Sequence, residues 1–172
     1  RGGAPSEITN SLLGVTLDQN PLPFFVIDDS HRIVQWSKGC EEILGKTAAE
    51  MIGTRNQWMP FYSQERPTLA DLVLDQAIEE IIEGKYIDKQ VRPSPSLPGA
   101  FEAVDYFPGL KNEGLWLHFT AAPIKDAAGR MVGVIETLQD ISLQHKADVQ
   151  LRLANSRLEM EVAERMVELS ES

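Results

Sequence analysis

The sequence predicts an α+β fold, in which a five-stranded antiparallel sheet carries helices on one face and is flanked by an N-terminal helix and a long C-terminal helix. Two observations lead to this class. Two strand-like runs come first, several short helical segments follow, and three more strand-like runs close the domain, a segregation typical of α+β folds. From Gln144 to the end there is neither Gly nor Pro, which indicates one long helix. The 172 residues therefore suit one domain with an appendage.

Residues 1–20 are predicted to form the flanking amphipathic helix. Ile8, Leu12 and Leu17 recur at helical spacings, and the segment 20–23 (Asn-Pro-Leu-Pro) ends the pattern. The first two strands then form a hairpin. Phe24–Ile27 is a run of aromatic and β-branched residues, turn-forming residues follow it, and a second such run covers 32–36.

Three short helices are expected between the hairpin and the later strands. One covers Cys40–Leu44, and a second begins at Thr47, which forms a capping box with Glu50. The third begins at an N-cap on Thr68 and continues to Gly84. Its acidic residues are expected on a solvent-exposed face, opposite the apolar stripe.

A proline-rich segment, 92–99, is expected to be a loop without regular structure. Three strands should follow it, at about 101–107, 115–124 and 131–138, joined as a meander. In the second of these strands His118 alternates with two apolar neighbours. It is therefore expected on the face away from the core, beneath a flanking helix or a dimer partner.

The C-terminal segment 143–172 is predicted to be a coiled-coil helix. Ala147, Leu151, Ala154 and Leu158 recur at heptad spacing, and apolar residues continue after a four-residue insertion. A single helix of this length is marginal in water, so it needs a partner, which we expect to be a second copy in parallel orientation.

Composition excludes several classes of function. The net charge of −10 and pI of about 4.7 disfavour nucleic acid and anionic membrane surfaces as partners. A single cysteine, Cys40, excludes an internal disulfide and any site that needs a cysteine pair. No apolar run approaches the length of a membrane span, and a cytoplasmic location is expected.

Three stretches, in this order and spacing, resemble the PAS domain, a bacterial sensory module. The first is the hairpin Phe25-Val26-Ile27-Asp28 with Ile33-Val34-Gln35-Trp36. The second is the segment 40–53, Cys-Glu-Glu-Ile-Leu-Gly-Lys-Thr-Ala-Ala-Glu-Met-Ile-Gly. The third is the segment 123–142, which ends in Asp140-Ile141-Ser142.

The resemblance implies a sensory domain over 21–142, in which Asp140, Ile141 and Ser142 pass a signal to the helix that follows. The tail 158–169 is similar to linkers that lead to histidine kinase or diguanylate cyclase domains. The implied protein is a homodimer through the coiled coil and the N-terminal helix, with a histidine kinase as the preferred output domain.

The same resemblance disfavours two cofactors. Light-sensing members of the family hold flavin beside a cysteine in an Asn-Cys-Arg-Phe-Leu-Gln context, whereas Cys40 lies in Lys-Gly-Cys-Glu-Glu and is expected to be buried and inert. Haem-binding members use a histidine on the long helix, and 69–84 contains none. The three histidines, His31, His118 and His145, are scattered, so no metal site is expected.

The candidate ligand-binding residues are Trp58, Phe61, Tyr62 and Arg66, in a segment longer than a minimal PAS domain needs. The rings could wall a cavity while Arg66 pairs with a ligand carboxylate. The alternative is that the rings pack within an oversized loop and that Arg66 forms an ion pair with Glu65 or Asp71. Tyr106 and Trp116 are expected in the core or in an interface.

Catalysis has no support in the sequence, which lacks a Gly-rich phosphate loop, a nucleophile elbow and a His-Glu-x-x-His motif. No catalytic residue is assigned. Three functions remain open: a small-molecule sensor, a ligand-free dimerisation and relay module, and, least favoured, a stand-alone enzyme.

Overall fold

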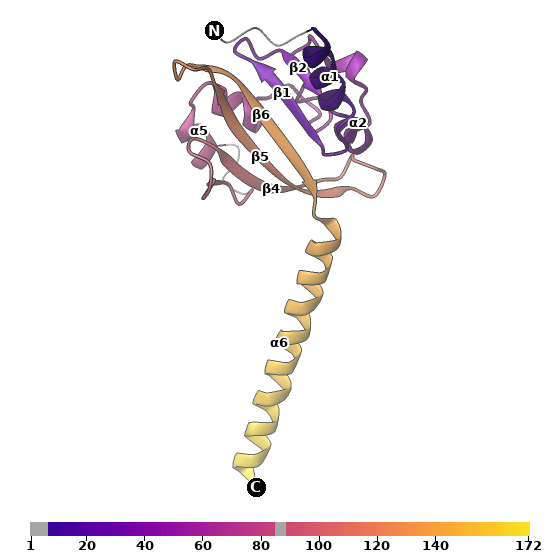
Figure 1. Cartoon of the computed structure of the whole chain (residues 1–172). Helices are drawn as coiled ribbons and strands as arrows, with labels where there is room; N and C mark the ends of the chain where they lie inside the picture. The colour runs from indigo at the N-terminus through magenta and orange to yellow at the C-terminus, as the bar shows by residue number, and fades with distance from the viewer. Residues whose placement is uncertain (1–6, 85–88) are drawn as a thin grey trace.

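The fold is a single antiparallel sheet with helices packed on one face and one long helix leaving it (Figure 1). The computed structural model describes residues 7–84 and 89–172. Residues 1–6, the start of the expected N-terminal helix, lie outside the described residues. The strands are β1 (Phe24–Asp28), β2 (Ile33–Trp36), β3 (Arg92–Pro93), β4 (Phe101–Phe107), β5 (Leu115–Lys125) and β6 (Met131–Asp140).

The strand order is β2-β1-β6-β5-β4-β3, so the last strand lies at the centre of the sheet. β6 pairs with β1 on one side, where Val26 faces Ile135, and with β5 on the other, where Phe119 faces Leu138. Because β6 is hydrogen-bonded to both halves of the sheet, a displacement of β6 would affect both. β6 also leads directly into the C-terminal helix.

The helices are α1 (Glu7–Asp18), α2 (Lys38–Leu44), α3 (Ala48–Met51), α4 (Leu69–Leu74), α5 (Ile78–Ile82) and α6 (Ser142–Glu171). α4 packs on β5 and β6, α2 on β1, and α3 on β2, while α1 lies beside β2. The predicted α+β class, with helices on one face and a long C-terminal helix, is confirmed.

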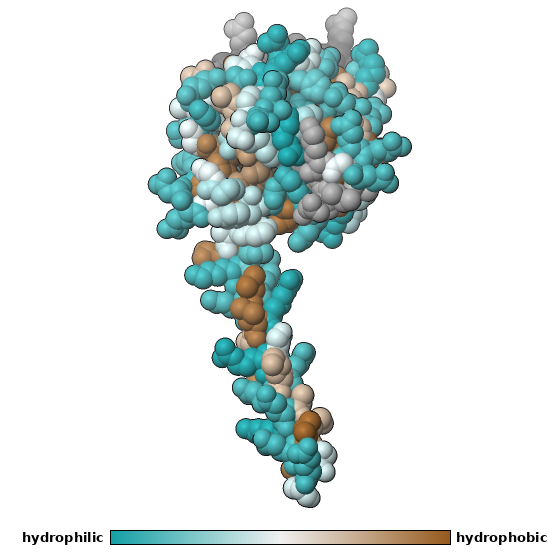
Figure 2. All heavy atoms as spheres, turned by 180° about the vertical axis from the view of Figure 1, so that it is seen from behind, coloured by the Kyte–Doolittle hydropathy of each residue, from teal (hydrophilic) through white to brown (hydrophobic). Residues whose placement is uncertain are grey.

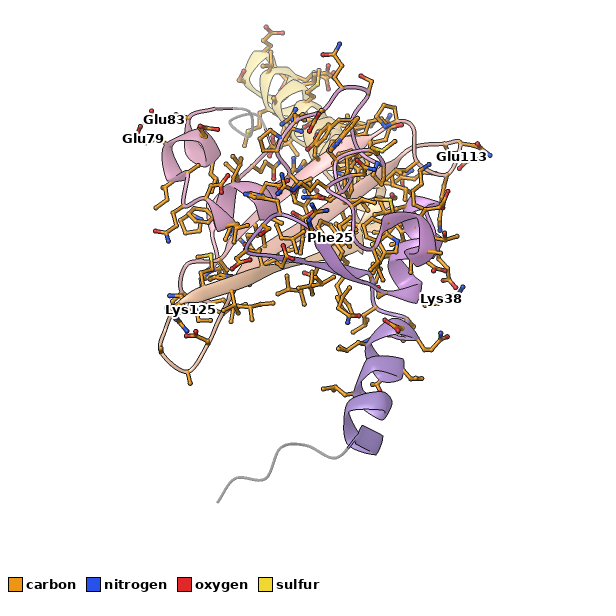
Figure 3. The ribbon with its side chains drawn as sticks, turned by 90° about the horizontal axis from the view of Figure 1, so that it is seen from above. Phe25, Lys38, Glu79, Glu83, Glu113 and Lys125 are labelled. Carbon is orange, nitrogen blue, oxygen red and sulfur yellow. The ribbon has the colours of Figure 1, made fainter. Side chains whose placement is uncertain are left out.

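The core lies between the sheet and α2–α5. Phe25 and Trp36 are fully buried there with ring centroids 5.5 Å apart, and Figure 3 shows Phe25 near the centre of the domain while Glu79 and Glu83 lie at its periphery. Leu117 and Phe119 of β5 are buried in the same core. His118, between them, therefore lies on the outer face of the sheet, as its alternation predicted.

Two predicted helix starts, at Thr47 and Thr68, are confirmed, whereas the first helix begins at Lys38 rather than at the predicted Cys40. Ser37 accepts a hydrogen bond from the Cys40 amide, and Thr47 forms its capping box with Glu50. Thr68 also caps α4, whose first-turn Asp71 completes a second capping box. These side chains satisfy backbone amides that a helix leaves without partners at its N-terminus.

The sheet has six strands and not the predicted five, because the start of the segment 92–99, expected to be a loop without regular structure, forms a strand. Arg92 and Pro93 form the short edge strand β3, in which Arg92 pairs with Glu102 and Pro93 with Phe101 of β4. Proline lacks an amide hydrogen and is tolerated at an edge, where a missing donor interrupts no inner ladder. Proline content alone therefore did not exclude a strand.

The predicted single helix 68–84 is also wrong, because it divides into α4 and α5. The amide of Gln76 donates to the Val73 carbonyl and that of Ala77 to the Leu72 carbonyl, while Gln76 has φ 53°. This is the Schellman arrangement that ends a helix. Asp71, expected on the solvent-exposed face, is instead 8% exposed.

Candidate functional site

Aromatic side chains and one carboxyl group surround a small cavity between the helices and the sheet. Its volume is about 10 Å³, the space of one water molecule. The lining comes from the segment before α4, from α4 itself and from three strands: Phe61, Tyr62, Thr68, Leu69, Phe107, Phe119 and Glu136.

Glu136, on β6, is the acidic side chain in this lining. It is 2% exposed, and its Oε1 accepts a hydrogen bond of 2.9 Å from the amide of Ala70 near the start of α4. Burial raises the pKa of Glu136 to about 8; the Ala70 amide opposes this shift and the charge of Asp71 adds to it. At neutral pH the carboxyl is therefore mostly protonated and can donate a hydrogen bond into the cavity.

A surface groove of about 670 Å³ lies beside the cavity, and three aromatic side chains, Phe61, Tyr62 and Phe107, line both spaces. The guanidinium of Arg66 lies over the Tyr62 ring, 4.1 Å from its centroid. The Lys89 ammonium is 5.0 Å from the same centroid and 2.6 Å from Asp105. Two cations thus lie over one aromatic ring, and Arg66 also lines the groove.

The structure brings three of the four candidate residues together. Phe61 and Tyr62 are in ring contact, with centroids 6.1 Å apart, and Arg66 stacks on Tyr62. Trp58 lines a different hollow of about 290 Å³, on the other side of Arg66, which borders both spaces. The alternative partner Asp71 also lines that second hollow.

Sequence reasoning missed Glu136, although a signal was present. In the strand predicted at 131–138, Glu136 has the same parity as Val134 and Leu138, so the alternation of β side chains places all three on the core face. Glu136 was missed because an acidic residue was assumed to face solvent.

The three relay residues gather around one residue of β5, Trp116. Its carbonyl accepts the Ile141 amide at 2.9 Å, and its amide donates to the Ser142 hydroxyl at 3.0 Å. The Ser142 amide in turn donates to Asp140 Oδ1 at 2.9 Å. The His145 ring stacks on the Trp116 indole, so β5 holds the first turn of α6 at several points. Tyr106 stands next to this contact, with its ring 5.4 Å from that of Trp116.

Cys40 is fully buried, as expected, and burial raises the pKa of its thiol far above the usual range. Among residues 7–84 and 89–172, no three His, Cys, Asp or Glu side chains are grouped as metal ligands. None of the helices in the described part of the chain combines the length and apolarity of a membrane span.

Comparison with curated proteins gives no match. Among solved structures, an RNA-binding light-oxygen-voltage receptor has a TM-score of 0.58 and 19% identity; the match covers 91% of this chain and 40% of that receptor. The PAS domain of Bordetella pertussis BvgS has a TM-score of 0.48 and 16% identity, covering 86% of this chain and 96% of that one. A PAS domain from Colwellia psychrerythraea has a TM-score of 0.43 and 17% identity, covering 77% and 97%.

These identities show a shared fold alone, and the chain spans well under half the length of the light-oxygen-voltage receptor. A family model described as PAS domain matches residues 21–143, which is most of the chain and nearly the same range as the domain predicted over 21–142. The match includes both the cavity-lining segment and the junction with α6. The chain therefore belongs to the PAS domain family.

Proposed function

We propose that this chain is the sensory part of a bacterial signalling protein, that it binds a small molecule, and that a dimeric α6 passes the change to an output domain. The PAS fold is a sensory fold, which supports the general role. The preferred output is a histidine kinase, with a diguanylate cyclase as the alternative. The domain itself acts without catalysis, and a cytoplasmic location suits it.

The observation that carries the proposal is the aromatic wall between groove and cavity. Because Phe61 and Tyr62 line both spaces and are only half-buried, rotation of their side chains would join the groove to the buried carboxyl of Glu136. A small organic acid could place its carboxylate on the fork of Arg66 donors and its apolar body against the rings. Trp58 would border the far side of Arg66.

The surface of α6 supports a dimer. Leu151 and Leu158, both at predicted seam positions, are 61% and 58% exposed, and Figure 2 shows apolar side chains interrupting the polar surface along this helix. A helix of 30 residues with such a stripe gains stability by burying it against a second copy. Leu13 and Val15 of α1 are also exposed and could add to the contact.

A second function, a ligand-free dimerisation and relay module, is favoured by one observation. The cavity of about 10 Å³ has no room for an organic ligand unless the aromatic wall moves. A relay module needs only the junction around Trp116 and the dimeric helix. A stand-alone enzyme is the least supported function.

Thermal shift against a panel of small mono- and dicarboxylic acids separates these functions. For a sensor, at least one acid raises the melting temperature of the full chain, and Arg66→Ala or Trp58→Ala removes the shift. Arg130→Ala, on the distant β5–β6 turn, is the matched control and should keep it, because Arg130 pairs locally with Asp126. If a broad metabolite panel produced no shift, the relay module would be the better account.

A further inference from the structure

A histidine outside the aromatic groove lies between two carboxylates of the α4 region. His31 is in the turn between β1 and β2. Its Nδ1 is 2.7 Å from Oδ1 of Asp71 and its Nε2 is 2.8 Å from Oδ1 of Asp75, the C-cap of α4. A neutral imidazole has a single N–H, so two such contacts with carboxylates require both nitrogens to carry hydrogen. The observed geometry is that of an imidazolium.

Asp71 has other partners that hold it in place. Gln57 Nε2 donates to Oδ1 at 2.8 Å, and the amide and hydroxyl of Thr68 each donate to Oδ2 at 2.8 Å. The same Gln57 amide donates to the His31 carbonyl at 3.1 Å, which ties the turn to this network. If the imidazolium loses a proton, one ring nitrogen becomes an acceptor facing a carboxylate. One of the two contacts must then open.

Besides Asp71 and Asp75, other charged groups lie around His31, and they come from two segments. Its own turn contributes Asp28, whose Oδ1 accepts the Ser30 and Arg32 amides, and Asp29. The segment before α4 contributes the remaining charged groups that line the same hollow as His31: Arg55, Glu65 and Arg66.

The net effect of this environment is to raise the pKa of His31. Burial is the largest single influence and lowers the pKa. The hydrogen bonds and charges of Asp71 and Asp75 together outweigh burial, so the pKa lies above its usual 6.5.

The clamp joins the first hairpin to the part of the domain that contacts β6. His31 has φ 63° and Gln76, directly after Asp75, has φ 53°, so each end of the clamp lies at a left-handed turn. At the other end of α4, the Ala70 amide is bonded to Glu136 of β6. β6 continues to Asp140 and α6. α4 is thus bonded to the strand that leads into α6, so a shift of α4 would displace that strand.

We propose that His31 is a proton sensor: its imidazolium clamps α4 to the β1–β2 turn, and loss of the proton releases α4 and alters the junction between β6 and α6. The stimulus is the proton, and the site is separate from the aromatic groove. The proposal therefore goes beyond small-molecule sensing and does not depend on it.

His31→Asn tests the clamp, because asparagine tolerates the left-handed conformation and has no charge at any pH used. Asp75→Asn removes only the second carboxylate. Asp29→Asn, in the same turn as His31, is the matched control, because the carboxylates that raise the His31 pKa are Asp71 and Asp75. The stabilisation should be complete below about pH 6.5 and should disappear as the pH rises through the folded-state pKa. The melting temperature of the wild type should therefore exceed that of His31→Asn at about pH 5.5, and the gap should close by about pH 8.5.

Histidine NMR on the same proteins should place the His31 pKa above 6.5 in the wild type and lower it in Asp75→Asn, with no change in Asp29→Asn. A difference in melting temperature between the wild type and His31→Asn that stays constant with pH would contradict the clamp. So would a His31 pKa at or below 6.5. If His31→Asn does not fold, the Asp75→Asn comparison carries the same test.

Hydrogen exchange at the first turn of α6 tests the signalling part. Protection factors, which correct for the intrinsic pH dependence of exchange, should change severalfold between the two pH values in the wild type. The change should be clearly smaller in His31→Asn, in which Glu136 still titrates over this range but the clamp cannot. Equal pH responses in both proteins would show that the clamp does not communicate with α6.

Discussion

The imidazole of His145 lies on the indole of Trp116, with ring centroids 3.8 Å apart and planes 20° apart. Trp116 also bonds through its backbone to Ile141 and Ser142, so one residue of β5 holds both the turn before α6 and its first helical turn. A change in the sheet at this point moves the helix with it. In the relay that we propose, this contact couples the sheet to α6, and the sequence-predicted Asp140-Ile141-Ser142 forms part of it.

His145→Ala should loosen this junction. Stacked aromatic pairs contribute about 0.5–1.5 kcal/mol beyond the area they bury, so we expect a fall in melting temperature of about 1–6 °C for a chain of this size. Hydrogen exchange should rise in residues 143–149. Gln150→Ala, on the same helix, is the control. If His145→Ala left exchange at the junction unchanged, the stack would not hold α6.

Glu136→Gln should remove much of the pH dependence of stability. Because the carboxyl has a pKa of about 8 when folded against 4.5 when unfolded, the folded state binds more protons between these values. Wild-type stability should therefore fall as the pH rises from about 4.5 to 8, by on the order of a few kcal/mol. The glutamine keeps an oxygen for the Ala70 amide and has no charge to bury.

Urea unfolding across this pH range measures the effect. Glu113→Gln, in the β4–β5 connection, should keep the wild-type slope because Glu113 is exposed. If the free energy of unfolding of Glu136→Gln still falls with pH above about pH 6.5, the remaining fall is the expected contribution of His31. Equal slopes in Glu136→Gln and the wild type would contradict the assigned state of the Glu136 carboxyl.

Cys40 should be unreactive in the folded protein. Burial and the nearby Glu136 and Glu41 all raise the pKa of the thiol, so almost no thiolate forms below pH 9. An aromatic disulfide reagent should label less than one thiol per chain in buffer and one in denaturant. Rapid labelling of the native protein would show that the α2 region opens.

Leu158→Asp should weaken the dimer, since it places a charge in the proposed seam. Sedimentation velocity should show more monomer for this variant than for Gln150→Asp, which adds the same charge off the seam. Deleting residues 143–172 should have a larger effect in the same direction. An unaltered dimer in the deletion variant would show that another surface holds the two copies together.

The local features of the fold could be predicted from the sequence because they depend on neighbouring residues. Thr47 and Glu50 form a capping box three residues apart, and Thr68 caps the helix that starts beside it. The heptad spacing and the absence of Gly and Pro likewise indicated α6. Each of these signals lies within a few residues of the structural feature that it predicts.

The features that the sequence concealed depend on contacts between distant segments. Nothing near His31 shows that Asp71 and Asp75, which are 40 and 44 positions away, lie against it. The candidate ligand segment was found from its aromatic residues, but its division around Arg66 depends on where Tyr62 meets Phe107 of β4. The central place of β6 is likewise a property of the whole sheet.

The most direct test of the central claim is a distance measurement between the two α6 helices. Because Cys40 is buried, a cysteine introduced at Gln150 can be spin-labelled in its presence, and pulsed electron resonance then gives the distance within the dimer. The acid that gives the largest thermal shift should change this distance distribution in the wild type and leave it unchanged in Arg66→Ala. Identical distributions with and without the acid in the wild type would contradict relay from the groove to α6.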